Sequence, residues 1–243
     1  MKLTESEIVT SVATEMGTPE VSARFGIAVM TLFSDLEGAD MTRERLFAAS
    51  AIGSAMRGFD DHFDSGDNDS ANAAKAALES GVHGQGLPCG LQQGIKIAID
   101  NLNPTANGVL VELAKAQFAS RRQKAPDVGV AEISLITENK GGLTAMLFAS
   151  AVNESISEER RNAYHALGVL MQLVDDYCDT YLDVQDGIQT LMTITAEGSE
   201  RDMMILRQFA KVKALSVLGF RGEKLDKILQ YAKKLVAKTG IIL

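Results

Sequence analysis

The sequence predicts an all-α protein, and three observations support this class. Good helix formers such as Ala, Leu, Met, Glu, Lys and Gln dominate the chain, and alternating runs of β-branched residues are nearly absent. The prolines are few, and none interrupts a long apolar stretch. Each lies just before a stretch of helical periodicity, where a helix would begin: Pro19, Pro88, Pro104 and Pro126.

We expect helices along the whole length of the chain. Their approximate ranges are 5–16, 19–36, 42–64, 69–80, 88–101, 105–121, 128–139, 141–153, 157–184, 199–217 and 222–238. Glycines that suit helix caps or turns lie between them, at Gly17, Gly38, Gly66, Gly81 and Gly219. No linker, charge block or internal repeat divides the sequence, so we expect a single helical domain over residues 1–243.

Composition and charge narrow the function classes. The chain has 46% hydrophobic residues, enough for a sizeable core, and a net charge of −8, which disfavours a nucleic-acid binder. Cys89 and Cys178 are too few for a disulfide framework, and the first residues lack the apolar core of a signal peptide. The uncharged stretches 46–56 and 162–174 are shorter than the roughly 20 residues that span a bilayer. We therefore expect a cytoplasmic protein with no integral membrane segment.

Two of the expected helices are unusual. The segments Leu46–Phe59 and Asn162–Val174 are apolar around most of their circumference, which is typical of a helix in the middle of a bundle. Each of them runs directly into a cluster of aspartates. A buried helix that ends in several carboxylates is the strongest functional signal in the sequence.

The two clusters share one spacing. Asp60 and Asp64, with Asp61 beside them, follow the first helix, and Asp175, Asp176 and Asp179 follow the second. Residues three and four apart lie on one helix face, so the carboxylates of each cluster are stacked. Stacked like charges cost free energy, and the cost rises with burial. Because Mg²⁺ prefers oxygen ligands, a bound divalent cation would offset this cost.

Other interpretations of the clusters fit the sequence less well. Either cluster alone is also typical of a solvated acidic helix end. A carboxylate-bridged di-iron bundle would need a Glu-x-x-His motif, which does not occur in the chain. A calcium loop starting at Asp67 would need glycine where Asn72 stands, and no Cys/His spacing suggests zinc.

In these residues the chain resembles the class I isoprenoid synthases, which include trans-prenyltransferases, terpene synthases and squalene/phytoene synthases. The resemblance covers residues 43–183 and rests on the ordered motifs FDDHFD at 59–64, NKGGL at 139–143 and QLVDDYCDTYLD at 172–183. It implies a helical bundle with a central apolar cavity, with the two aspartate motifs facing each other across its mouth and holding up to three Mg²⁺ ions.

The resemblance also implies roles for individual residues. By position, the metal ligands would come from both motifs: Asp60, Asp61, Asp64, Asp175, Asp176 and Asp179. Lys140 would hold the substrate diphosphate, and Gln172 and Gln117 match recurrent substrate-binding positions. Phe59 and Phe63 would set the depth of the cavity. The metals would make the diphosphate a leaving group, and the allylic cation so formed would be sheltered from water.

The motifs depart from the family at one place. Chain-elongating enzymes carry an Arg-Arg pair shortly after the first motif, whereas this chain has the acidic segment 65–70 there; its own pair, Arg121-Arg122, lies far away. We therefore expect an enzyme that ionises one prenyl diphosphate, as terpene synthase-like lyases and cyclases do. Two alternatives stay open: a chain-elongating trans-prenyltransferase, and a non-catalytic partner subunit or prenyl-lipid-binding bundle. The resemblance also makes a homodimer possible.

Overall fold

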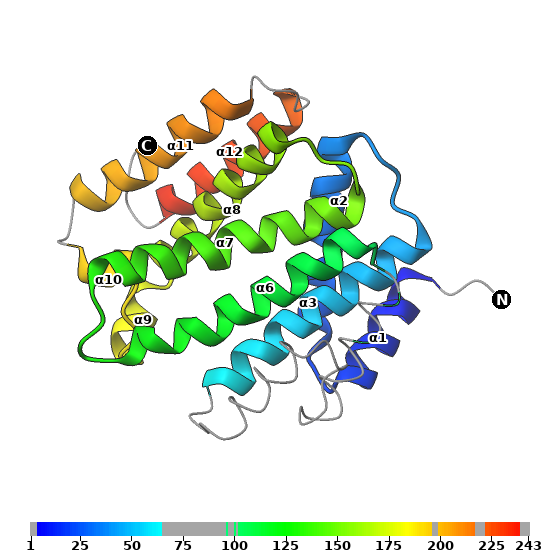
Figure 1. The fold of residues 1–243 in the computed structure, drawn as a ribbon, viewed down its shortest axis with the longest axis horizontal. Helices are drawn as coiled ribbons and strands as arrows, with labels where there is room; N and C mark the ends of the chain where they lie inside the picture. The colour runs from blue at the N-terminus through cyan, green and yellow to red at the C-terminus, as the bar shows by residue number, and fades with distance from the viewer. Residues whose placement is uncertain are drawn as a thin grey trace. The chain divides into compact units, whose positions relative to one another are not determined.

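The computed structural model describes residues 4–64, 96, 100, 102–195, 199–216 and 222–238. All of the regular structure in these residues is helical, which confirms the all-α prediction (Figure 1). The elements are α1 (Glu5–Met16), α2 (Glu20–Glu37), α3 (Arg43–Asp64), α6 (Pro104–Ala119), the 3₁₀-helix η1 (Ser120–Lys124), α7 (Val130–Val152), α8 (Glu158–Cys178), α9 (Thr180–Gln185), α10 (Leu191–Ile194), α11 (Ser199–Ser216) and α12 (Gly222–Lys238). The helices expected at 69–80 and 88–101 lie almost entirely outside the described residues.

The chain forms two compact units. The first comprises Met1–Phe118 and Leu147–Ser155, and the second comprises Ala119–Met146 and Ile156–Leu243. The long helix α7 contributes its residues up to Met146 to the second unit and its last residues to the first. Each unit has its own buried apolar core, and the two acidic motifs lie in different units.

Local sequence explains where several helices begin and end. Thr4 accepts a hydrogen bond from the backbone N–H of Glu7, whose carboxylate accepts one from Thr4 in return, so a complete capping box starts α1. Gly17 and Gly38 end α1 and α2 with φ of 63° and 68°, a conformation that glycine adopts without strain. Asn103 caps α6 through Ala106, with Pro104 as the first helical residue.

In the first unit, α3 packs against both α1 and α2. Its middle is buried on nearly all sides, from Ala48 to Ala55, as expected for a central helix. Gly26 of α2 and Gly53 of α3 lie at the contact, and a Cβ atom on either would overlap a carbonyl oxygen of the other helix. Phe33 of α2 and Phe148 stack with ring centroids 6.2 Å apart and add to this core.

In the second unit, α8 is the central helix. It packs against α10, α11 and α12, and its buried residues run from Ala163 to Val174 on several faces. The side chain of Tyr164 is completely buried and belongs to the core. Gln208 of α11 donates a hydrogen bond of 2.7 Å to the carbonyl oxygen of Ala166 and ties α11 to the middle of α8.

Helix α7 differs from its expected form. The sequence predicts two helices, 128–139 and 141–153, but α7 runs unbroken through Gly141 and Gly142. These glycines permit a close crossing with α8 and do not end the helix. A Cβ atom on Gly141 would lie 2.5 Å from the carbonyl oxygen of Gly168 and 2.7 Å from Cβ of Gln172, and one on Gly168 would overlap the carbonyl oxygen of Gly141.

The expected helix 157–184 is also different, because it is divided at Asp179 into α8 and α9. The Thr180 hydroxyl donates to the carbonyl oxygens of Asp176 and Tyr177, both at 2.9 Å, which is a known way to bend a helix. The short helix α10, capped by Thr190, was not expected, since four residues carry no readable periodicity.

Within the described ranges, every helix is either too short or too polar to cross a bilayer.

The glycine crossing of α7 and α8 makes a test possible. Gly168→Ala should lower the free energy of unfolding by about 1–3 kcal/mol, because the new methyl group pushes the two backbones apart. Gly108→Ala in α6 is the matched control; nothing lies within 4 Å of the position that its methyl group would take, so it should raise stability by up to about 1 kcal/mol. Urea denaturation measures both, and equal effects would contradict the close crossing.

Candidate functional site

The second acidic motif lies at the junction of α8 and α9. Asp175 and Asp179 are exposed, Asp176 is buried with 7% of its surface accessible, and Asp183 on α9 is partly buried. Backbone hydrogen bonds of 2.9 Å from Asp179 to Asp175 and from Asp183 to Asp179 continue through the break. The carboxylates of Asp175, Asp179 and Asp183 are therefore spaced one turn apart, as the sequence predicts.

The carboxyl group of Asp176 is the most perturbed acid in the described residues. Gln172, one turn earlier, donates a hydrogen bond of 2.8 Å from Nε2 to Oδ1 of Asp176. The other oxygen, Oδ2, is buried and has no hydrogen-bond partner among the described residues. Burial raises the pKa of Asp176 to about 7, with smaller contributions from Asp175 and Asp183 in the same direction, while Gln172 and Lys140 act against it.

Lys140 of α7 belongs to the same site. Its ammonium group is close enough to lower the pKa of both Asp176 and Asp183. The contact of Gly141 with Gly168 and Gln172 explains this proximity, because it holds the residue next to Lys140 against the turn of α8 that precedes Asp176. The fold therefore brings Lys140 of α7 near Gln172 and Asp176, which already lie one turn apart on α8.

The pKa values of two further groups are raised near the same carboxylates. Partial burial raises the pKa of Asp183 to about 6, and the negative charges of Asp179 and Asp175 contribute to this rise. Partial burial also raises the pKa of the Cys178 thiol, and the negative charges of Asp175 and Asp179 act in the same direction. The junction of α8 and α9 is therefore a region of concentrated negative charge, and Lys140 is the cation on the described part of the chain that perturbs its acids.

The first acidic motif lies on α3, in the first unit. The helix backbone extends through Asp64, but the side chains of Asp60, Asp61, Phe63 and Asp64 lie outside the described residues. Phe59, directly before the motif, is completely buried. Gln117 is also buried, on α6. That the two motifs share metal ions stays a prediction.

Among the side chains that the structure describes, which exclude 60–64, no group of three or more His, Cys, Asp or Glu is arranged to hold a metal ion by itself. The second motif taken alone is thus not a complete metal cage. Mg²⁺ commonly takes only one or two carboxylates, with water and substrate phosphate as its other ligands. The exposed carboxylates of Asp175 and Asp179, one turn apart, are donors of the kind and number that this chemistry needs.

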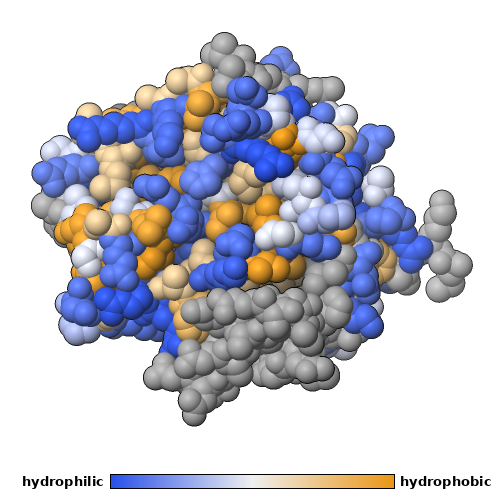
Figure 2. All heavy atoms as spheres, viewed as in Figure 1, coloured by the Kyte–Doolittle hydropathy of each residue, from blue (hydrophilic) through white to orange (hydrophobic). Residues whose placement is uncertain are grey.

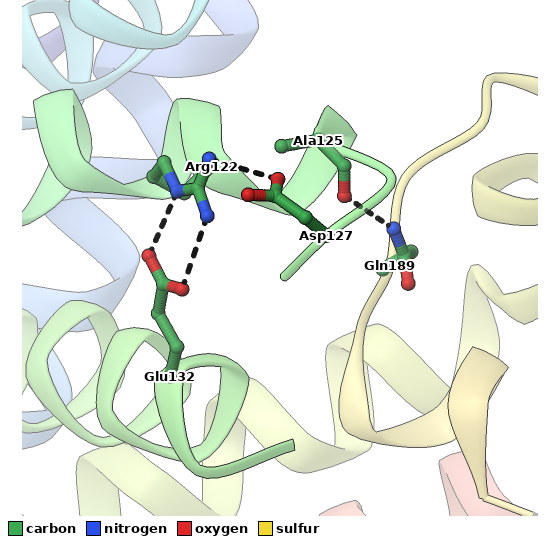
Figure 3. A network of polar contacts seen from close by, with 5 residues as sticks. All are labelled: Arg122, Ala125, Asp127, Glu132 and Gln189. Carbon is green, nitrogen blue, oxygen red and sulfur yellow. Dashed lines mark hydrogen bonds and ion pairs between the residues drawn. The ribbon is translucent and has the colours of Figure 1, made fainter. Parts of the chain in front are cut away.

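Within the basic pair Arg121-Arg122, Arg122 is held by local contacts. Figure 3 shows Arg122 between Asp127 and Glu132, with nitrogen–oxygen distances of 3.1 Å and 2.9 Å. These carboxylates raise the pKa of Arg122 above its ordinary value. Beside it, Gln189 donates a hydrogen bond of 2.8 Å to the carbonyl oxygen of Ala125 and fastens the segment after α9 to this turn (Figure 3).

Two residues that position the site were not expected from the sequence. Gly168 permits the approach of α7, and Thr180 bonds the carbonyl oxygens of the acidic turn. The signal for Gly168 would have been its partner Gly141-Gly142, since small residues on two helices indicate close packing. For Thr180, a hydroxyl residue directly after an acidic cluster gives only a weak signal.

Comparisons with known proteins give no relative: the chain has no significant match to a family model, a curated protein or a solved structure.

The raised pKa of Asp176 predicts a pH-dependent stability. In the unfolded chain its carboxyl ionises near pH 4, whereas in the folded protein it keeps its proton up to about pH 7. The free energy of unfolding should therefore fall as the pH rises through this window, by an amount on the order of 2–4 kcal/mol. Asp176→Asn removes this effect, so the variant should gain stability relative to the unmodified protein from pH 4 to pH 7.

Denaturation by urea at pH 4.5, 6 and 8, with a chelator present, measures this trend. Asp186→Asn is the matched control, because its carboxylate is exposed at the end of α9. The control should show no comparable gain. A stability difference between Asp176→Asn and the unmodified protein that stays constant with pH would contradict the burial of this carboxyl group.

Proposed function

We propose that the protein is an Mg²⁺-dependent enzyme that ionises an allylic prenyl diphosphate, in the manner of terpene synthase-like lyases and cyclases. The observation that carries the proposal is the meeting of Lys140, Gln172 and Asp176 next to the exposed Asp175 and Asp179. The family resemblance assigns these residues to diphosphate and metal binding, and they come from two separate motifs: Lys140 lies on α7, and the others lie in the acidic motif at the end of α8.

The electrostatics of the junction support a cation at this place. The carboxyl group of Asp176 is buried, has a pKa of about 7, and has one oxygen without a hydrogen-bond partner among the described residues. Burying such a group costs folding free energy. A divalent cation beside it would favour its ionised form and supply the missing partner. When bound, Mg²⁺ would neutralise the diphosphate and make it a better leaving group.

The chain's own residues have separate roles in binding the metal and the diphosphate. The exposed Asp175 and Asp179 would serve as metal ligands, and Gln172 donates a hydrogen bond to the carboxyl group of Asp176. The ammonium of Lys140 would bind a diphosphate oxygen through a charge-assisted hydrogen bond. When the allylic C–O bond breaks, its electron pair leaves with the diphosphate, and Lys140 stabilises the negative charge that develops there.

Ionisation of a single substrate is preferred to chain elongation for a specific reason. Elongation requires a second anion site for isopentenyl diphosphate, and the segment after the first motif is acidic. The basic pair at Arg121-Arg122 is a poor substitute, because Arg122 is already paired with Asp127 and Glu132. The carboxylates of Asp127 and Glu132 beside Arg122 would repel a second diphosphate.

The activity can be tested with geranyl, farnesyl and geranylgeranyl diphosphates in the presence of Mg²⁺. We expect release of inorganic pyrophosphate from at least one of them, and none in the presence of a chelator. Asp175→Asn and Asp60→Asn/Asp64→Asn should each lower the rate by roughly 100-fold or more, because each removes ligand oxygens. Asp186→Asn, an exposed carboxylate of the same segment, should leave the rate unchanged.

Products decide between the alternatives. Hydrocarbons or alcohols of the substrate's chain length support ionisation, whereas longer diphosphates formed on addition of isopentenyl diphosphate would indicate a chain-elongating prenyltransferase. Absence of turnover with all three substrates, in a protein shown to be folded, would contradict the enzyme proposal and leave the non-catalytic bundle.

Binding of diphosphate can be measured apart from turnover. Inorganic pyrophosphate with Mg²⁺ should raise the melting temperature of the unmodified protein, and Lys140→Ala should weaken this binding by about 10- to 100-fold, the ordinary effect of losing one charge-assisted hydrogen bond. Lys124→Ala, an exposed lysine of η1, is the matched control. Equal binding by both variants would remove Lys140 from the proposed site.

A further inference from the structure

The charges of this protein are distributed unevenly along the chain. Residues 201–243 contain ten Lys and Arg against three Asp and Glu, whereas residues 1–200 contain fourteen against twenty-nine. The last part of the sequence is therefore strongly basic in a protein whose net charge is −8. Such asymmetry is typical of a protein in which one part of the chain contacts an anionic surface.

Helix α11 carries part of this charge on its outer face. Its inner face carries the buried side chains of Ile205, Phe209 and Val212. Arg207, Lys211 and Lys213 are exposed, and the acidic residues of α11, Glu200 and Asp202, lie in its first turn, with none from residue 203 to residue 216. Because Arg207 and Lys211 are four residues apart, they lie on the same side of the helix.

Two apolar side chains lie among these cations. Met203 is 46% exposed and Leu206 is 38% exposed, and both are within about one turn of Arg207. In Figure 2, apolar and hydrophilic residues are interspersed over α11, at the upper left of the view. A helix face that combines cations with exposed apolar side chains is the pattern of a surface that lies on a membrane interface.

The inner contacts keep this face directed outward. The hydrogen bond from Gln208 to Ala166 anchors α11 to α8, and α12 packs against both helices. Lys233 of α12 lies over the ring of Phe209, 5.8 Å from its centroid. Helix α12 also presents Lys227 and Lys234 to solvent, together with Glu223 and Asp226.

We propose that the outer face of α11 docks the protein onto an anionic lipid membrane as a peripheral contact. The cations attract lipid phosphates, and Met203 and Leu206 enter the interfacial layer. The acidic remainder of the chain is repelled by the same surface, which orients the molecule. A nucleic acid would also attract the cations through its phosphates. Its charged backbone, however, has no apolar layer in which Met203 and Leu206 could be buried.

The full-length protein can be tested by co-sedimentation with vesicles of phosphatidylcholine containing about 30% phosphatidylglycerol, against vesicles of pure phosphatidylcholine. We expect binding to the anionic vesicles alone, and its loss in about 0.5 M NaCl. Arg207→Gln/Lys211→Gln should lower the partition coefficient by about tenfold. Arg24→Gln/Lys124→Gln removes the same charge from exposed positions outside this segment and should leave binding nearly unchanged.

A second variant separates apolar insertion from charge. Met203→Ser/Leu206→Ser keeps every cation and should still lower binding several-fold. No binding to anionic vesicles, equal loss with the control pair, or binding to RNA that competes with the vesicles would each overturn the proposal. Circular dichroism confirms that each variant is folded. Because diphosphate ionisation is measured separately in vesicle-free buffer, failure of one proposal leaves the other standing.

Discussion

The close approach of α7 and α8 is the constraint on which the candidate site depends. Two glycines, Gly141 and Gly168, face each other where any side chain would meet backbone atoms. Glycine in a helix interior costs about 1 kcal/mol relative to alanine, so the chain accepts this cost for a short interhelical distance. The short distance in turn brings Lys140 into the field of Asp176 and Asp183, which no contact within α8 could achieve.

The carboxyl group of Asp176 shows how the second unit tolerates a polar group in its interior. Gln172 satisfies one oxygen, Lys140 lowers the cost of ionisation, and a bound proton removes the charge below about pH 7. The neighbours Asp175 and Asp179 are exposed. One motif thus contains two kinds of carboxyl group, buried and exposed, and the difference arises from which face of α8 each residue occupies.

Charge is organised on a larger scale as well. The second unit contains the acidic junction of α8 and α9, the ion pairs of Arg122 with Asp127 and Glu132, and the basic outer face of α11. The cations of α11 and the carboxylates at the end of α8 thus lie on different elements of this unit. This separation is consistent with both a cation-dependent diphosphate site and a contact with anionic lipid.

The sequence by itself determined the helical class, the central positions of the two apolar helices and most helix limits, because periodicity and capping residues are local properties. It also identified Lys140 in one motif and Gln172 with Asp176 in another as candidate site residues. Only the tertiary structure decided that Gly141 and Gly142 lie inside one helix, that Asp179 divides another, and that Asp176 is the buried member of its pair. These outcomes depend on which backbones approach each other, and a single chain's residue pattern does not record that distance.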